Sequence, residues 1–231
     1  MAGRLLSIIF KAVLAIGCLA GLVLNLVQTK NPVSLLSYYT IQSNLVCLVL
    51  FAILLILEIK ASSKLKPRAW QDRPWLSLLK GGCTVYILLT FLVYNFMLAP
   101  SIAEVSTSYQ LFSMPDLLVH YFSPLMVLLD YFLFDRKGRF KAVYPLGWAL
   151  LPLAYLFYVF VFVSLGGRFY YGGYASKYPY FFLNIDKLGL AGVGKWILFI
   201  AAGYLLLSYV LTAIDYLLGK LADYWEKREQ Y

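Results

Sequence analysis

Three small polar residues, Thr40, Ser43 and Asn44, stand at the beginning of an apolar segment of the chain. They are three and four residues apart, so a helix would place them on one face, with Gln42 pointing the other way. A threonine hydroxyl acts as a nucleophile when a neighbouring base removes its proton. Such a base for Thr40 must come from another part of the chain.

His120 is the only histidine in the sequence. It lies about one turn into a later apolar segment, on the face that also carries Asp116, Ser123 and Pro124. An ionisable side chain inside an apolar helix marks a candidate functional site, although a structural hydrogen-bonding role is the alternative. The stretch Ser113–Asp116 fits a capping box with proline in the first turn, which predicts that Asp116 caps the helix rather than acting as a catalytic acid.

Thr40 and His120 together would form the minimal pair of nucleophile and general base. Histidine titrates near neutral pH and can accept the threonine proton as the hydroxyl attacks an ester carbonyl. Thr40 would then be acylated, His120 would return the proton, and water would complete the hydrolysis. The developing oxyanion needs hydrogen-bond donors, and the candidates for oxyanion or substrate contact are Asn44, Asn95 and Ser43.

Each of these residues also has an ordinary structural interpretation. A threonine near a helix start often caps the helix or bonds back to its backbone. Asparagines in membrane helices, and small polar residues such as Ser43, often join one helix to another. Asp130, Asp135 and Asp215 lie beside basic loops, where ion pairing or headgroup contact explains them. Asp130 is too far from His120 for a triad, about 15 Å along a helix axis.

Apolar helices must position these residues. Of the 231 residues, 62% are hydrophobic and only 13% are charged, and the mean hydropathy is +0.75. This composition predicts an integral membrane protein and excludes a soluble globular domain. A chain of this length has room for about six spans of about 20 residues with short loops. We therefore predict one all-α transmembrane domain that covers residues 1–231.

Six apolar segments are predicted to span the membrane. They are Leu5–Val27, Tyr38–Ile59, Leu78–Leu98, Pro115–Phe134, Val143–Leu165 and Leu190–Leu218. The connections on one side carry fifteen Lys and Arg residues, and those on the other side carry five. Because Lys and Arg are enriched in cytoplasmic loops, both termini should be cytoplasmic. Thr40 and His120 should then share a depth within about 10 Å of the outer boundary.

The formal net charge of +9 comes mainly from these loops. We interpret it as the charge that fixes orientation and contacts anionic lipid headgroups, and we expect no nucleic-acid partner. Cys18, Cys47 and Cys83 all fall inside apolar segments without a metal-binding pattern, so we predict that they are small core residues. No metal or organic cofactor is expected, because one histidine and dispersed carboxylates do not make a zinc site.

Tyrosines gather on the predicted outer side. They precede the second segment and recur in the long connection 166–189, as Tyr38, Tyr39, Tyr170, Tyr171, Tyr174, Tyr178 and Tyr180. Interfacial anchoring of aromatic rings explains this pattern. The alternative is a loop that covers a substrate, because the connection, which contains Gly172 and Gly173, is longer than a tight turn requires. Both interpretations stay open.

Three short motifs follow one another along the chain: Tyr38-Tyr39-Thr40, His120-Tyr121-Phe122-Ser123-Pro124 and Tyr178-Pro179-Tyr180-Phe181-Phe182-Leu183. With six spans, this layout resembles the androgen-induced and androgen-dependent protein family of membrane hydrolases and its small bacterial relatives. The resemblance implies that Thr40 and His120 are the catalytic pair and that the substrates are fatty acid esters of hydroxy fatty acids. It also implies a prokaryotic plasma membrane, with the site facing the extracytoplasmic leaflet.

These patterns predict an intramembrane lipid ester hydrolase whose partners are membrane lipids and a fatty-acyl ester. One alternative is a small transporter or channel in which His120 and the asparagines line a polar path, but beyond Asn44 the segments become mainly Leu, Val, Ile and Phe. Another is a lipid-binding or assembly protein without chemistry, which predicts that Thr40 and His120 lie far apart. The sequence makes no prediction of the oligomeric state.

Overall fold

The computed structural model describes residues 2–63, 73–101, 112–171 and 174–228. In chain order its elements are α1 (Ala2–Gln28), α2 (Pro32–Leu36), α3 (Tyr39–Ser63), α4 (Pro74–Val93), η2 (Tyr94–Leu98), α6 (Met114–Leu117), η3 (Leu118–Phe122), α7 (Ser123–Phe134), α8 (Tyr144–Trp148), α9 (Leu150–Ser164), β1 (Phe169–Tyr171), β2 (Tyr174–Ser176), η4 (Phe181–Leu183) and α10 (Ile185–Arg228). Both η2 and η3 are π-helical turns, and η4 is a 3₁₀ turn. Five residues used in the loop predictions lie outside these ranges: Lys64, Lys66, Arg68, Gly172 and Gly173.

Six helices of the described chain are long and apolar enough to cross a membrane. They are Gly3–Gln28, Tyr39–Ala61, Pro74–Ser101, Met114–Phe134, Tyr144–Ser164 and Ile185–Arg228. Each coincides with one predicted segment, which confirms the prediction of an all-α transmembrane bundle. The last helix differs most, because it continues past Leu218 to Arg228. A break at Gly189, whose φ of 65° lies in the left-handed region that favours glycine, separates its first turn from the rest.

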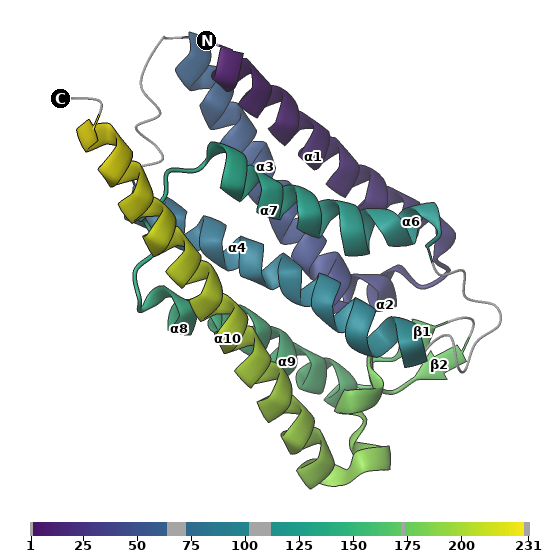
Figure 1. The fold of residues 1–231 in the computed structure, drawn as a ribbon. Coiled ribbons are helices and arrows are strands. Elements are labelled where there is room, and N and C mark those ends of the chain that lie inside the picture. Colours follow the sequence, from purple (N-terminus) through teal and green to yellow (C-terminus); the bar gives the residue numbers. More distant parts are fainter. Residues whose placement is uncertain (1, 64–72, 102–111, 172–173, 229–231) are drawn as a thin grey trace.

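Both chain termini lie at one end of the bundle, and α2, α6 and the β1–β2 hairpin lie at the opposite end (Figure 1). Helix α4 runs through the middle. One buried cluster joins α4 to α8, α9 and α10 and contains Trp148 and Tyr204. A second joins α1, α3, α4 and α7 and contains Cys18, Cys47 and Cys83. All three cysteines are free and buried, which confirms that they are core residues.

Two glycines let α1 approach the segment that carries His120. Gly17 and Gly21 are four residues apart on α1. A methyl group on Gly17 would lie 2.0 Å from Cε1 of Phe122, and one on Gly21 would lie 3.0 Å from Cβ of Leu118. Small residues at this spacing allow membrane helices to pack closely. The contact therefore sets the separation of α1 and η3, and with it the position of His120.

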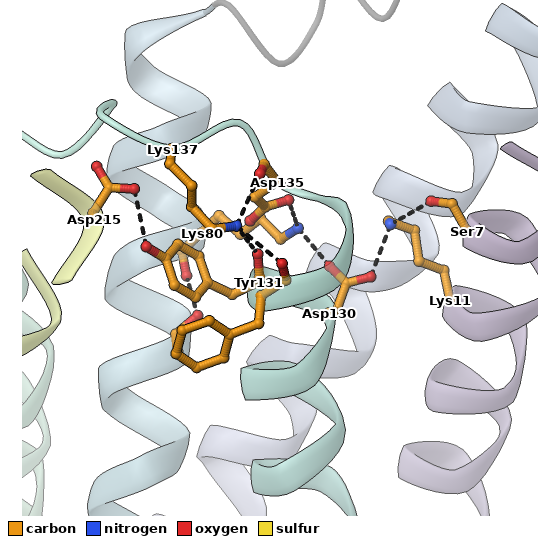
Figure 2. Close-up of polar contacts among 10 residues, drawn as sticks. Ser7, Lys11, Lys80, Asp130, Tyr131, Asp135, Lys137 and Asp215 are labelled. Atoms are coloured by element: carbon orange, nitrogen blue, oxygen red, sulfur yellow. Dashed lines mark hydrogen bonds and ion pairs between the residues drawn. The ribbon is translucent and has the colours of Figure 1, made fainter. Parts of the chain in front are cut away.

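A buried cluster of charged side chains joins α1, α4 and the end of α7 (Figure 2). Asp130 accepts hydrogen bonds from Lys11 at 2.8 Å and from Lys80 at 2.5 Å, and Lys80 also pairs with Asp135. Asp215 accepts a bond from the Tyr131 hydroxyl at 3.0 Å. The predicted ion pairing is thereby confirmed for Asp130 and Asp135.

The charge count included Lys11 with the amino terminus and first turn, and Lys80 with the flank of the second loop, but both side chains lie inside the bundle. Their exposed fractions are 0% and 4%. Both lysines enter the bundle because Asp130, itself fully buried, offers a carboxylate oxygen to each. A buried charge that is paired in this way reports on packing rather than on membrane orientation. Without the two lysines, thirteen Lys and Arg residues remain on that side against five on the other.

Candidate active site

Thr40 and His120 meet at the end of the bundle opposite the termini. The Oγ1 atom of Thr40 lies 3.2 Å from Nε2 of His120. Thr40 belongs to the first turn of α3 and is half-buried, and His120 lies in η3 with 9% of its surface exposed. The two side chains therefore reach the same depth from separate helices, as their positions in the sequence predicted.

Asp116 extends this contact into a chain of three hydrogen-bonded side chains. Its Oδ1 atom lies 2.9 Å from Nδ1 of His120. Because an ionised carboxylate accepts hydrogen bonds and donates none, this contact assigns the imidazole proton to Nδ1. The lone pair of Nε2 is then directed at the Thr40 hydroxyl. Asp116 thus takes the place of the orienting acid in a nucleophile–histidine–acid triad.

The capping-box prediction for the same segment is confirmed only in part, because Asp116 binds a backbone N–H before α6 but Ser113 does not. Ser113 makes no side-chain capping bond at the start of α6. The other oxygen of Asp116, Oδ2, accepts a hydrogen bond from the Tyr94 hydroxyl at 2.6 Å and from the Phe112 backbone N–H at 3.1 Å. Asp116 and His120 are four residues apart on one helical face, so the carboxylate reaches the imidazole while it also ties down the backbone before α6.

Tyr94 contacts both Asp116 and His120. Its ring stacks on His120 with centroids 3.7 Å apart and an interplanar angle of 13°. Its hydroxyl donates to Asp116, so one side chain fixes the plane of the His120 imidazole and the position of the Asp116 carboxylate. Tyr94 begins the π-helical turn η2, and His120 lies in the π-helical turn η3. Such turns are frequent at functional sites because they redirect side chains.

A proline leaves one carbonyl of the π-helical turn η3 without its usual partner. The backbone N–H of Ser123 bonds to the Leu118 carbonyl, five residues back. In the same register the Val119 carbonyl would accept from residue 124, which is proline and has no N–H. A buried carbonyl without a donor is costly, so another group must supply one.

Asn44 supplies that donor. Its Nδ2 atom donates to the Val119 carbonyl at 3.0 Å and to the Thr40 carbonyl at 2.8 Å. Both amide hydrogens of Asn44 are therefore engaged. The predicted role of Asn44 as an oxyanion donor is disfavoured, because no N–H of this amide remains to bind an oxyanion. Its position ties α3 to η3 and keeps Thr40 beside His120.

The other two predicted oxyanion candidates also make structural hydrogen bonds. Asn95 donates to a carbonyl of its own helix at 2.8 Å and accepts from the Tyr121 hydroxyl at 2.8 Å. Ser43 lies within 3.0 Å of the Thr40 carbonyl and 2.8 Å of Oγ1 of Thr90. The contact of Asn95 with Tyr121 joins η2 to η3, and the contact of Ser43 with Thr90 joins α3 to α4. A role for Asn95 or Ser43 in binding substrate stays a prediction.

An apolar cavity of about 230 Å³ begins beside Thr40. It lies between α4, α9 and α10, and its walls are mainly leucine, isoleucine and aromatic side chains. Tyr155 and Tyr180 line it together with Thr40. Leu153 also lines it and is 52% exposed, so the cavity reaches the outer surface of α9. A mainly apolar cavity with a few polar groups at one end is typical of a ligand-binding site.

The tyrosine-rich connection between α9 and α10 packs over the start of α3. The Tyr38 hydroxyl donates to the Tyr170 carbonyl at 3.1 Å, and the Tyr39 backbone N–H donates to the Tyr180 hydroxyl at 3.1 Å. Tyr178 is buried, with 6% of its surface exposed. These contacts place the connection against the candidate site, which favours the covering loop over simple interfacial anchoring.

No family model, curated protein or solved structure matches the chain. The assignment of a function to the site therefore depends on its geometry and on the chemistry of its residues. Among the described residues, no group of three or more His, Cys, Asp or Glu side chains is placed to hold a metal ion. The chemistry to be explained is that of a hydroxyl, an imidazole and a carboxylate beside an apolar cavity.

Three residues of the site have roles that the sequence did not predict. The spacing of four residues between Asp116 and His120 indicates a possible contact on one helical face, but the capping-box pattern favoured another role for Asp116. Tyr180 was identified only as part of the tyrosine-rich connection and of the third motif, and nothing in the sequence pointed to Tyr94. Their contacts form only when η2 packs on η3 and when the last loop folds over α3.

Proposed function

We propose that this protein is an intramembrane ester hydrolase with Thr40 as the nucleophile, His120 as the general base and Asp116 as the residue that orients His120. The observation that carries the proposal is the hydrogen-bonded chain of these three side chains, with contacts of 3.2 Å and 2.9 Å. Nucleophile, base and orienting acid within hydrogen-bond reach are what acyl transfer through a covalent intermediate requires.

The reaction would proceed in two halves. The Thr40 oxygen attacks the ester carbonyl carbon while its proton passes to Nε2 of His120, and the carbonyl electron pair moves onto the carbonyl oxygen. When this intermediate collapses, the alcohol leaves with the proton from His120 and the acyl group stays on Thr40. Water, deprotonated by His120, then attacks the acyl group, releases the fatty acid and restores the Thr40 hydroxyl.

The substrate we propose is a fatty-acyl ester that enters from the bilayer. The apolar cavity offers an acyl chain a binding site that begins at the nucleophile and reaches the exposed face of α9. An acyl chain that passes from the bilayer into this cavity stays in apolar surroundings, so its entry requires no exposure of apolar surface to water. Support for fatty acid esters of hydroxy fatty acids comes from the resemblance of three motifs to a family of membrane hydrolases that cleaves them.

We place the site toward the extracytoplasmic leaflet of the membrane. Thr40 lies in the first turn of α3 and contacts His120. The start of α3, next to α2, lies at the end of the bundle away from both termini (Figure 1). The excess of Lys and Arg in the connections near the termini supports a cytoplasmic position for that end.

Hydrolysis of a fatty-acyl ester by the purified protein tests the proposal. Thr40→Ala and His120→Ala should each lower kcat by about 10²-fold or more, since each removes a group that moves in the reaction. The matched control is Thr212→Ala, which removes a buried threonine hydroxyl bonded to the Ser208 carbonyl of α10. It should keep full activity. Full activity of the Thr40→Ala protein would overturn the proposed mechanism.

A further inference from the structure

The proposed hydrolysis needs a donor for the oxyanion, and Asn44 is already engaged. Tyr180 lies at the required place. It belongs to the motif Tyr178–Leu183 before α10, and its hydroxyl accepts a hydrogen bond from the Tyr39 N–H at 3.1 Å. The same hydroxyl makes hydrogen-bonding contact with the side chain and the backbone N–H of Thr40. A phenol group therefore sits against the nucleophile at the mouth of the apolar cavity.

The start of α3 explains why this hydroxyl is held so closely. The first backbone N–H groups of a helix have no acceptor within the helix. Here the N–H groups of Tyr39 and Thr40 both point at the Tyr180 oxygen. The Tyr180 ring stacks on Phe182 with centroids 5.1 Å apart and meets the edge of Tyr38 at 6.2 Å. The hydroxyl is thus fixed before any substrate arrives.

The hydrogen-bond arrangement directs the Tyr180 proton at the Thr40 oxygen, because the Thr40 hydroxyl gives its own proton to the bond with His120. A phenol oxygen accepts through its lone pairs and donates through a single O–H. Two backbone N–H groups occupy the accepting positions. The Tyr155 hydroxyl lies 3.2 Å from the Ser37 carbonyl and also makes a hydrogen-bonding contact with the Tyr180 hydroxyl. Burial raises the pKa of Tyr180 to about 12, so the group is a neutral donor at physiological pH.

We propose that Tyr180 is a further catalytic residue, whose O–H donates a hydrogen bond to the ester carbonyl oxygen as that oxygen becomes an oxyanion. The inference rests on the proposed function. The Thr40 oxygen forms the new bond to carbon, the threonine proton goes to His120, and Tyr180 keeps its proton throughout. When the carbonyl re-forms, the hydrogen bond weakens and the alcohol takes the proton from His120.

The donor should act on the transition state more than on the bound substrate. Removing one oxyanion donor typically lowers kcat by about 10²–10³-fold. Tyr180→Phe should therefore lower kcat by that factor with little change in KM. It should also weaken inhibition by an alkylboronic acid, whose tetrahedral anionic adduct with a hydroxyl resembles the intermediate. Binding of the matching alkyl alcohol, which forms no adduct, should stay unchanged.

Tyr178→Phe is the matched control, because Tyr178 is buried in the same motif and packs under the Lys177 ammonium rather than against Thr40. It should behave as the wild type in every assay. Wild-type kcat and boronate inhibition in Tyr180→Phe, with activity lost in Thr40→Ala, would overturn the role of Tyr180 alone. Full activity in Thr40→Ala, or no turnover by the wild type, would overturn the proposed function and this inference together.

A second variant keeps the hydroxyl in case Tyr180→Phe fails to fold. Replacing Tyr180 by 3,5-difluorotyrosine retains the contacts of the ring and lowers the pKa of the phenol. If Tyr180 must be protonated to act, the loss of kcat at alkaline pH should move to lower pH in this protein. An unchanged pH profile would overturn the proposal.

Discussion

The carboxylate of Asp116 bonds to Nδ1 of His120 at 2.9 Å, on the opposite side of the ring from Thr40. This relationship fixes the tautomer that can accept the Thr40 proton. In Asp116→Asn the side-chain amide can turn its N–H toward Nδ1, which places the imidazole proton on Nε2. We expect kcat to fall by about 10⁴-fold, as for a similar change in other triads, with little change in KM. Kinetics on the purified variant check this, and wild-type kcat would exclude Asp116 from the mechanism.

Tyr94 offers a graded test of the same pair. Tyr94→Phe keeps the ring over His120 and removes the hydrogen bond to Asp116, whose contribution is about 1.5–3 kcal/mol for a charged acceptor. Tyr94→Leu removes the stacking as well. We therefore expect activity to decrease from wild type to Tyr94→Phe to Tyr94→Leu. Equal activity in all three proteins would show that the imidazole needs no support from this ring.

Much of this fold follows from the sequence. Runs of apolar residues predicted six membrane spans, because each span must bury about 20 residues in hydrocarbon. The contact of Thr40 with His120 was predicted from their equal depth in the membrane, since both lie about one turn into helices that enter from the same end. These features depend on local composition and on the direction of the chain.

Contacts between distant segments were harder to foresee. Burial of Lys11 depends on Asp130 of another helix, and no local pattern identifies such a pair. The stacking of Tyr94 on His120 depends on two π-helical turns, whose register the sequence does not reveal. The role of Asp116 could not be decided from the sequence either, because its short motif fits both a helix cap and an acid that orients a histidine.

Asn44 should contribute mainly to stability through its two bonds to backbone carbonyls. Asn44→Leu leaves the Val119 carbonyl buried without a donor, which costs about 1–3 kcal/mol. We expect a lower thermal unfolding temperature in detergent, together with reduced activity because α3 and η3 are no longer tied. Gln42→Leu is the matched control, since Gln42 is less buried and bonds only to the Leu36 carbonyl among the described contacts. Equal stability of the two variants would contradict this role.

The charged cluster in Figure 2 predicts that the loss of stability from substituting Lys11 is partly reversed by substituting Asp130 as well. Removing Lys11 leaves Asp130 and Asp135 to share Lys80, and removing Asp130 leaves Lys11 without its carboxylate. Either change alone therefore leaves one uncompensated charge in the bundle, at a cost of about 3–5 kcal/mol. Removing both leaves Lys80 paired with Asp135. We therefore expect the double variant Lys11→Met/Asp130→Leu to be more stable in thermal unfolding than either Lys11→Met or Asp130→Leu. Additive losses of stability would contradict a direct pair.

The most direct test of the account is to locate the nucleophile by a fluorophosphonate probe, which forms a stable covalent bond to an activated hydroxyl. The labelled protein would be digested and its modified residue identified by mass spectrometry. We predict a phosphonate on Thr40, lost in Thr40→Val, which keeps the shape of the side chain without the hydroxyl, and formed more slowly in His120→Ala. A phosphonate on another residue, or unchanged labelling of Thr40→Val, would contradict the central claim that Thr40 is the nucleophile.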